Sequence, residues 1–451
     1  MKKGLDNKEM VFISSMLFGM FFGAGNLIFP SSMGVAAGGN TLYAYIGMFI
    51  TAAGLPLLAV ASLGISRSDS VLEMTQPAGH KFAVFFVTLL YLTLGPLFAA
   101  PRCASTSFSI IGVTMAEGSR ATALGIFSFI FFLFVLYLSL HPGKIMTWIG
   151  KILNPSFLFL LFVLIATAML NPIQSMFGAT PAAAYATPGK AVITGFLEGY
   201  NTLDALSGLA FGILVINEIR RMGVDEPTSI AKSTIGAGVF SCLVMGFVYL
   251  LIALMACQSA SICGKCSNGS EILGVIAGHY YGYMGTLLLC AIVTLACLKT
   301  AVGLITSCSE TFTRMFPGTL SYRNWTCLFV LISFVIANLG LTTIIRYCIP
   351  VLMFLYPLAI VFILLALGTK YLHQDSQVYK AAIATTFVAA LLDFFNTLAP
   401  LLDKNSSLYA FLQGINGFSN TYIPFFSIGL GWIIPALIGL GIGLSMRRKE
   451  V

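Results

Sequence analysis

Two short segments combine glycine with polar side chains inside long apolar runs. The first is Gly23-Ala24-Gly25-Asn26, and the second is Gly199-Tyr200-Asn201-Thr202, followed closely by Asp204. Glycine favours unwinding of a helix, and an unwound helix inside a membrane leaves N–H and C=O groups that hydrocarbon cannot satisfy. Half-helix N-termini attract carboxylates, and loose carbonyl oxygens attract cations. These residue types therefore predict a site for an anionic group and a cation.

The composition assigns the chain to the integral membrane proteins. Hydrophobic residues make up 58% of the 451 residues and charged residues only 9%, against about a quarter charged in soluble domains. One helical crossing takes about 20 apolar residues. The apolar runs predict an all-α fold of twelve transmembrane helices, at residues 10–35, 41–66, 81–112, 122–140, 144–170, 192–220, 228–258, 284–312, 323–345, 347–368, 377–400 and 423–445.

The basic residues between these segments predict the orientation of the chain. Most of them fall on the side that holds the N-terminus, including Arg67, Arg220, Arg221, Arg314 and Lys380. Cytoplasmic loops carry an excess of lysine and arginine, so both termini are predicted to be cytoplasmic. The net charge of +8 then reflects topology and contact with anionic membrane lipid. We expect no nucleic-acid partner and no obligatory protein partner.

The two glycine-containing breaks fall in the first and sixth predicted helices. This spacing predicts a single membrane domain over residues 1–451, with five-helix halves at 10–170 and 192–368 and two additional helices at 377–445. Interrupted helices at matching places of two halves are typical of inverted-repeat transporters. The alternative is that the glycines serve close helix packing and that the polar residues hydrogen-bond neighbouring helices.

The segment 17–30, Leu-Phe-Gly-Met-Phe-Phe-Gly-Ala-Gly-Asn-Leu-Ile-Phe-Pro, resembles the opening signature of the bacterial branched-chain amino acid:cation symporters. Further similar motifs extend over essentially the whole chain, at 94–96, 100–102, 199–204, 211–213 and 338–341. The resemblance implies a LeuT-like fold of the amino acid-polyamine-organocation superfamily in a bacterial inner membrane. It also implies inward transport of leucine, isoleucine or valine with sodium or a proton. Transport of another small apolar amino acid, such as methionine, with protons is the alternative.

The resemblance also implies roles for single residues. The amides of Ala24 and Gly25 meet the substrate carboxylate, while Asn26 orients the substrate or a cation. The predicted substrate site comprises Gly23, Ala24, Gly25, Asn26, Tyr200, Asn201 and Thr202. The predicted cation-binding or coupling site comprises Gly19, Phe22, Asp204, Ala296, Lys299 and Thr300. No cofactor is expected apart from the coupling ion, and no metal apart from sodium.

Lys299 departs from the family pattern, which has paired hydroxyl residues where this chain has Lys299 and Thr300. Those hydroxyls help to bind sodium, whereas an ammonium group satisfies the same carbonyl oxygens with a tethered charge. Proton coupling therefore stands beside sodium coupling as a prediction. The alternative is that Lys299 turns away and pairs with a buried acid such as Asp393 or Glu198.

The cysteines and histidines, which could bind metal or act in catalysis, form no complete motif for either. Cys257, Cys263 and Cys266 lie in or beside the loop after the seventh predicted helix, where a disulfide or free thiols are expected rather than a metal site, because no second ligand pair accompanies them. The four histidines lie in loops or at helix ends without a nucleophile or acid motif. These observations argue against an enzyme, and the paired breaks argue against a channel.

Overall fold

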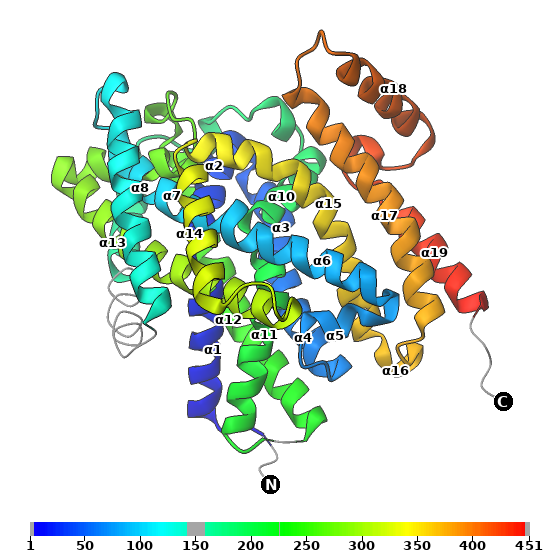
Figure 1. Cartoon of the computed structure of the whole chain (residues 1–451). Coiled ribbons are helices and arrows are strands. Elements are labelled where there is room, and N and C mark those ends of the chain that lie inside the picture. The colour runs from blue at the N-terminus through cyan, green and yellow to red at the C-terminus, as the bar shows by residue number, and fades with distance from the viewer. Residues whose placement is uncertain (1–3, 142–157, 225, 447–451) are drawn as a thin grey trace.

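The computed structural model describes residues 4–141, 158–224 and 226–446, and over these residues it contains helices and loops but no strand (Figure 1). Each of the twelve predicted segments contains a described helix, although residues 144–157 of the fifth segment lie outside the described ranges. Seven helical stretches of the described chain are long and apolar enough to cross a membrane, and a bent pair makes an eighth. The shorter apolar helices are Leu158–Leu170, Tyr322–Ala337 and Ile433–Met446.

The first part of the chain contains eight helices, and two of its membrane segments are interrupted. The helices are α1 (Asn7–Phe21), α2 (Gly25–Ala37), α3 (Thr41–Phe49), α4 (Leu55–Ser66), α5 (Val71–Thr75), α6 (His80–Leu92), α7 (Ala99–Gly112) and α8 (Glu117–Leu140). A short loop separates α1 from α2. A π-helical turn at Thr93–Leu97 separates α6 from α7, where Pro96 lacks the N–H that an α-helix needs.

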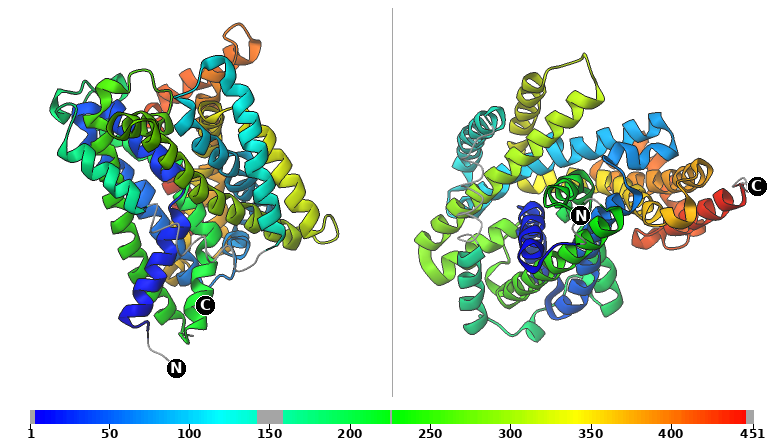
Figure 2. Two further views of the ribbon diagram at one scale, coloured as in Figure 1. Left: turned by 90° about the vertical axis from the view of Figure 1, so that its left-hand side faces the viewer. Right: turned by 90° about the horizontal axis from the view of Figure 1, so that it is seen from below.

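The remaining helices continue to the end of the described chain. They are α10 (Pro188–Glu198), α11 (Asp204–Arg221), α12 (Pro227–Gln258), α13 (Gly269–Met315), α14 (Tyr322–Ala337), α15 (Leu341–Leu367), α16 (Thr369–Leu372), α17 (Ser376–Leu398), α18 (Ser407–Tyr422) and α19 (Ile433–Met446). Helices α17 to α19 lie together at one side of the molecule, in orange and red (Figures 1 and 2). The additional helices thus flank the core rather than enter it.

Some predicted helix ends were wrong, and the backbone explains why. Helix α14 ends at Ala337 instead of residue 345, and α15 begins at Leu341. Between them Gly340 has φ +82°, a conformation that glycine adopts readily and that ends a helix. Apolar residues on both sides of Gly340 hid this turn from a hydropathy-based prediction.

The last predicted helix, 423–445, also begins later than expected. Helix α19 starts at Ile433, because Phe425 and Gly429 adopt positive φ values and form a turn before it. Helix α18 precedes this turn and was not predicted. Gln413, Asn416, Ser419 and Asn420 interrupt its apolar residues, so it lacks the continuous apolar run that marks a membrane crossing.

Helix α13 is longer than the predicted segment 284–312, and it changes direction at Gly282, which has φ +64°. The segment before Gly282, residues 269–281, packs between α2 and α7. A Cβ atom on Gly269 would lie 1.9 Å from the carbonyl oxygen of Ile28, and one on Gly274 would lie 2.3 Å from that of Ile110. Real Cβ contacts are longer than this, so these helices approach each other backbone to backbone.

Glycine also brings α10, the first part of the second broken helix, close to α3. A Cβ atom on Gly195 of α10 would lie 1.9 Å from the Ala44 carbonyl oxygen of α3. In return, a Cβ atom on Gly47 of α3 would lie 1.9 Å from the Val192 carbonyl oxygen. This reciprocal contact fixes the end of α10, where the second break begins.

We expect Gly195→Ala to lower the thermal unfolding temperature of the purified protein in detergent. The added methyl group meets backbone that cannot move aside, and overpacking of this kind costs about 1–3 kcal/mol. Gly189→Ala in the same helix is the matched control, because no atom lies within 4 Å of its added Cβ and alanine favours helix. Equal unfolding temperatures for the two variants would contradict the proposed contact.

Candidate functional site

The first break is a loop of three residues, 22–24, between α1 and α2. The Asn26 side-chain oxygen accepts a hydrogen bond from the Gly23 N–H (2.8 Å), and the Asn26 N–H donates to the Gly23 carbonyl (3.2 Å). The N–H of Ala24 has no acceptor among the described residues, and that of Gly25 has none within its own helix. The break therefore presents N–H groups at the positive end of α2.

The second break joins α10 to α11 with a bend of 43°. A 3-10 turn at Gly199–Thr202 ends the first helix, and Leu203 then adopts φ +66°. A leucine in the left-handed region is strained and persists only when its surroundings hold it there. Thr51 provides part of this support, because its hydroxyl donates to the Phe196 carbonyl (2.8 Å) and touches Gly199 closely.

Asp204 connects the second break to the first. Its carboxylate oxygen Oδ2 accepts hydrogen bonds from the side-chain amide of Asn26 (2.8 Å) and from the hydroxyl of Tyr249 in α12 (2.7 Å). The Asn26 amide and the Tyr249 hydroxyl are also hydrogen-bonded to each other. All three side chains are buried. A carboxylate in this position is held by polar partners from two other helices, as a buried charge requires.

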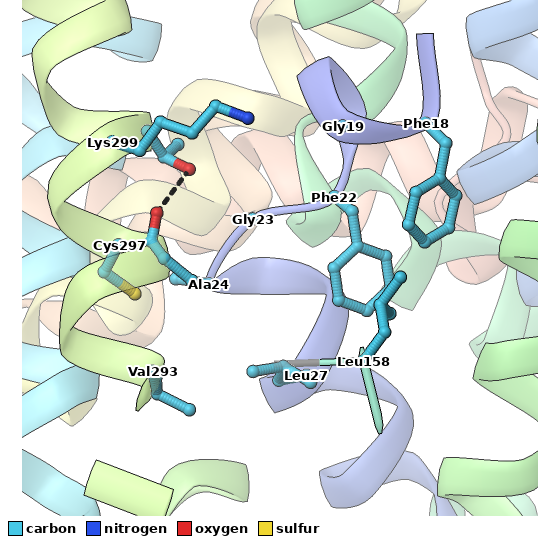
Figure 3. Close-up of a pocket in the computed structure, with 12 residues that line it drawn as sticks. Phe18, Gly19, Phe22, Gly23, Ala24, Leu27, Leu158, Val293, Cys297 and Lys299 are labelled. Atoms are coloured by element: carbon cyan, nitrogen blue, oxygen red, sulfur yellow. Dashed lines mark hydrogen bonds between the residues drawn. The ribbon is translucent and has the colours of Figure 1, made fainter. Parts of the chain in front are cut away.

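Five residues of the predicted cation site surround one small cavity of about 20 Å³, which has room for about one water-sized particle. They are Gly19, Phe22, Ala296, Lys299 and Thr300. Figure 3 shows Lys299 extending from α13 toward the end of α1. The Thr300 hydroxyl donates to the Ala296 carbonyl (3.2 Å). Asp204, the sixth predicted member, does not line this cavity and belongs to the network with Asn26.

The predicted partners of Lys299 do not pair with it. Within the described ranges Lys299 forms no ion pair. Glu198 instead accepts a hydrogen bond from the Asn201 side chain (3.0 Å), and both carboxylate oxygens of Asp393 lack a hydrogen-bond partner there. Lys299 thus remains beside the small cavity, where its ammonium group has no acid to balance it.

The predicted substrate residues of the two breaks lie next to each other. A Cβ atom on Gly25 would be 3.1 Å from the Thr202 carbonyl oxygen, so the first break touches the second directly. The Tyr200 ring stacks on Tyr356 of α15, with ring centres 4.1 Å apart. Asn201 uses its side chain for Glu198 and its carbonyl for Arg102. Tyr249, Tyr356 and Arg102 complete this region from other helices.

A large cavity of about 680 Å³ adjoins the small one. Gly19, Lys299 and Thr300 line both cavities. The large cavity is otherwise lined mainly by residues 69–72 at the start of α5, by α6, by α11 and by α13 after Thr300. The small cavity at the first break is therefore continuous in its lining with a much larger space.

The cysteines near the loop after α12 are free thiols. Cys257, Cys263 and Cys266 form no disulfide, and the Cys257 thiol donates to the Gly38 carbonyl (3.2 Å). In the described part of the chain, no group of three or more histidine, cysteine, aspartate or glutamate side chains is arranged for a metal ion.

Two adjoining helix breaks, a buried polar network between them and a large cavity beside the first break define a membrane carrier of the broken-helix class. The family model described as "Branched-chain amino acid transport protein" matches residues 6–450. The chain belongs to this family, which is a family of transporters and not of enzymes.

Curated relatives match over nearly their whole lengths. The branched-chain amino acid permease BrnQ of Lactobacillus delbrueckii subsp. lactis is 46% identical, over 97% of this chain and 96% of the relative. The permease BraB of Bacillus subtilis strain 168 is 36% identical, over 98% and 96%. The branched-chain amino acid transport system 2 carrier protein of Pseudomonas aeruginosa is 35% identical, over 99% and 97%.

Solved structures share the fold at low sequence identity. The nucleobase-cation-symport-1 family transporter Mhp1, in a closed conformation, superposes with a TM-score of 0.59 at 13% identity, over 97% of this chain and 92% of that one. The manganese transporter of Eremococcus coleocola gives a TM-score of 0.57 at 14% identity, over 98% and 96%. These similarities confirm the predicted fold class.

We expect Tyr249→Phe to destabilise the protein, because it removes a hydrogen bond to the buried carboxylate of Asp204. A loss of this kind costs about 1–3 kcal/mol. Tyr356→Phe is the control, since the Tyr356 hydroxyl is equally buried but has no hydrogen-bond partner in the described ranges. Thermal unfolding in detergent measures both variants. A Tyr356→Phe variant that is as unstable as Tyr249→Phe would show that the bond to Asp204 is not what matters.

Proposed function

We propose that the chain imports leucine, isoleucine and valine across a bacterial cytoplasmic membrane by symport with a cation. The observation that carries this proposal is the first break, where the N–H groups of Ala24 and Gly25 have no helical partners and Gly25 adjoins Thr202 of the second break. Such groups at a helix N-terminus bind a carboxylate. The names of the relatives support branched-chain amino acids as the substrates.

The substrate is proposed to bind between the two breaks. Its carboxylate meets Ala24 and Gly25, and the adjoining residues Gly23, Asn26, Tyr200, Asn201 and Thr202 shape the rest of the site. Asn26 acts mainly by joining the first break to Asp204, because its side-chain atoms are occupied by Gly23, Asp204 and Tyr249. Methionine transport with protons is the alternative, and competition by unlabelled methionine against labelled leucine distinguishes it.

The large cavity is proposed to open toward the cytoplasm. Arg314 lines it, and Arg220 lies on α11, which also lines it. Basic residues concentrate on the cytoplasmic side of membrane proteins. Both chain termini then face the cytoplasm. Large apolar side chains on outer helices, such as Phe134 of α8 and Leu331 of α14, are more than half exposed and suit contact with lipid.

Coupling is proposed to involve Gly19, Phe22, Ala296, Lys299 and Thr300, which surround the small cavity, together with Asp204. With an ammonium group at this cavity, a sodium ion beside it is repelled by about 4 kcal/mol at 4 Å and an effective dielectric constant of 20. That energy corresponds to roughly a thousandfold loss of sodium affinity. A proton is therefore the coupling ion that the site favours over sodium.

We expect Gly25→Ala to abolish uptake of labelled leucine into proteoliposomes. The added methyl group would lie 2.8 Å from the Arg102 guanidinium and 3.1 Å from the Thr202 carbonyl, and it fills the place where a carboxylate approaches the backbone. Gly118→Ala, near the start of α8, is the control, because no atom lies within 4 Å of its added Cβ. Uptake by Gly25→Ala equal to that of the unaltered protein, at equal membrane levels, would exclude this position of the substrate.

We expect the unaltered protein to take up leucine without sodium and to respond to an inward proton gradient. Lys299→Thr should make uptake depend on sodium, because it removes the tethered charge and supplies a hydroxyl in its place. Proteoliposomes with imposed sodium or pH gradients separate the two driving forces. Lys232→Thr, at an exposed lysine of α12, controls for the loss of a positive charge. Strict sodium dependence of the unaltered protein would refute proton coupling through Lys299.

A further inference from the structure

Arg102 is a buried arginine that contacts both helix breaks. It lies in α7 with 5% of its surface exposed. One guanidinium nitrogen, Nη1, donates to the Asn201 carbonyl of the second break (2.7 Å). The other, Nη2, lies 2.8 Å from the position of a Cβ atom on Gly25 in the first break. The group also lies over the Phe29 ring of α2, 5.3 Å from its centre.

Arg102 forms no ion pair in the described part of the chain. No carboxylate lies within 4.0 Å of it there, and its Nε–H has no hydrogen-bond acceptor. Asp204, the buried acid of the same region, is held by Asn26 and Tyr249 instead. An unpaired guanidinium inside a membrane protein is costly, so such groups are kept where an anion completes them.

We propose that Arg102 binds the carboxylate of the transported amino acid, together with the amides of Ala24 and Gly25. Guanidinium groups recognise carboxylates through two parallel N–H···O bonds, and Nη2 lies at the break where the carboxylate is expected. The inference rests on the proposed function and adds a requirement to it. The ligand must be an α-amino acid with a free, ionised carboxylate.

Carboxylate binding explains why the residue at this position is charged, which a purely structural role would not require. If Arg102 only bridged the breaks, its bond to Asn201 would suffice and a neutral donor would serve. The protein instead buries a charge beside Gly25, the residue that follows the unbonded amide of Ala24. A substrate carboxylate satisfies both groups, and it draws α7 and the two breaks together around the ligand.

The test compares L-leucine with L-leucinamide, which keeps the amine and the side chain but lacks the carboxylate. Both compete against radiolabelled leucine on the purified, full-length protein in detergent. The unaltered protein should bind leucinamide roughly 100-fold more weakly than leucine, as the loss of a charged pair of hydrogen bonds implies. Arg102→Gln should bind leucine about as weakly as leucinamide, so that the ratio falls to within about 3-fold. Thermal stabilisation by millimolar ligand extends the comparison to weak binders.

Two further variants keep the test decisive. Arg102→Lys retains the charge and should keep most of the preference for leucine, with weaker overall binding. Arg120→Gln, at a half-buried arginine near the start of α8, should leave the ratio unchanged. An unchanged ratio in Arg102→Gln, or the absence of any preference in the unaltered protein, overturns the proposal. Failure of the unaltered protein to bind leucine, isoleucine or valine would instead contradict the proposed function.

Discussion

The hydrogen bond from Asn26 to Asp204 joins the two interrupted helices, and the central structure depends on it. Both helices lose backbone hydrogen bonds where they break, and lipid offers no replacement. Asn26 closes the first loop with its oxygen and reaches the second break with its amide. Asp204, at the start of α11, receives that amide and a tyrosine from α12. One amide side chain thus stabilises two irregular segments, which leaves other backbone groups available to a ligand.

The charges at the centre are kept separate by their partners. Asp204 is satisfied by neutral donors, Arg102 contacts a carbonyl and an aromatic ring but forms no ion pair, and Lys299 lies beside the small cavity without an acid. If these groups paired with one another, their charges would be neutralised and could not attract a charged ligand. In the proposed mechanism, the separation lets a zwitterionic substrate and a coupling ion enter a region whose electrostatics are incomplete without them.

Local sequence patterns predicted the parts of the structure that depend on local chemistry. Glycine and asparagine within apolar runs located both breaks, and the resemblance to a family grouped five residues that do surround one cavity. The partnership of Asp204 with Tyr249 and the position of Arg102 between the breaks could not be predicted. They arise from contacts between helices that are far apart in the chain. A tyrosine or arginine within an apolar run does not reveal which neighbouring helix its side chain will contact. The turn at Gly340 was missed because hydropathy does not report backbone dihedral angles.

The first half of α13 has a mechanical consequence for the transport cycle. Its glycines place backbone against backbone on α2 at Ile28 and on α7 at Ile110, and such surfaces fit in one register only. Residues 269–281 are therefore held by both helices, and moving this segment away from α2 or α7 would break backbone-to-backbone contacts. The helix changes direction at Gly282, which has a positive φ, and the later residues Lys299 and Thr300 line the small cavity. One long helix thus divides into a segment packed against α2 and α7 and a segment that borders the small cavity.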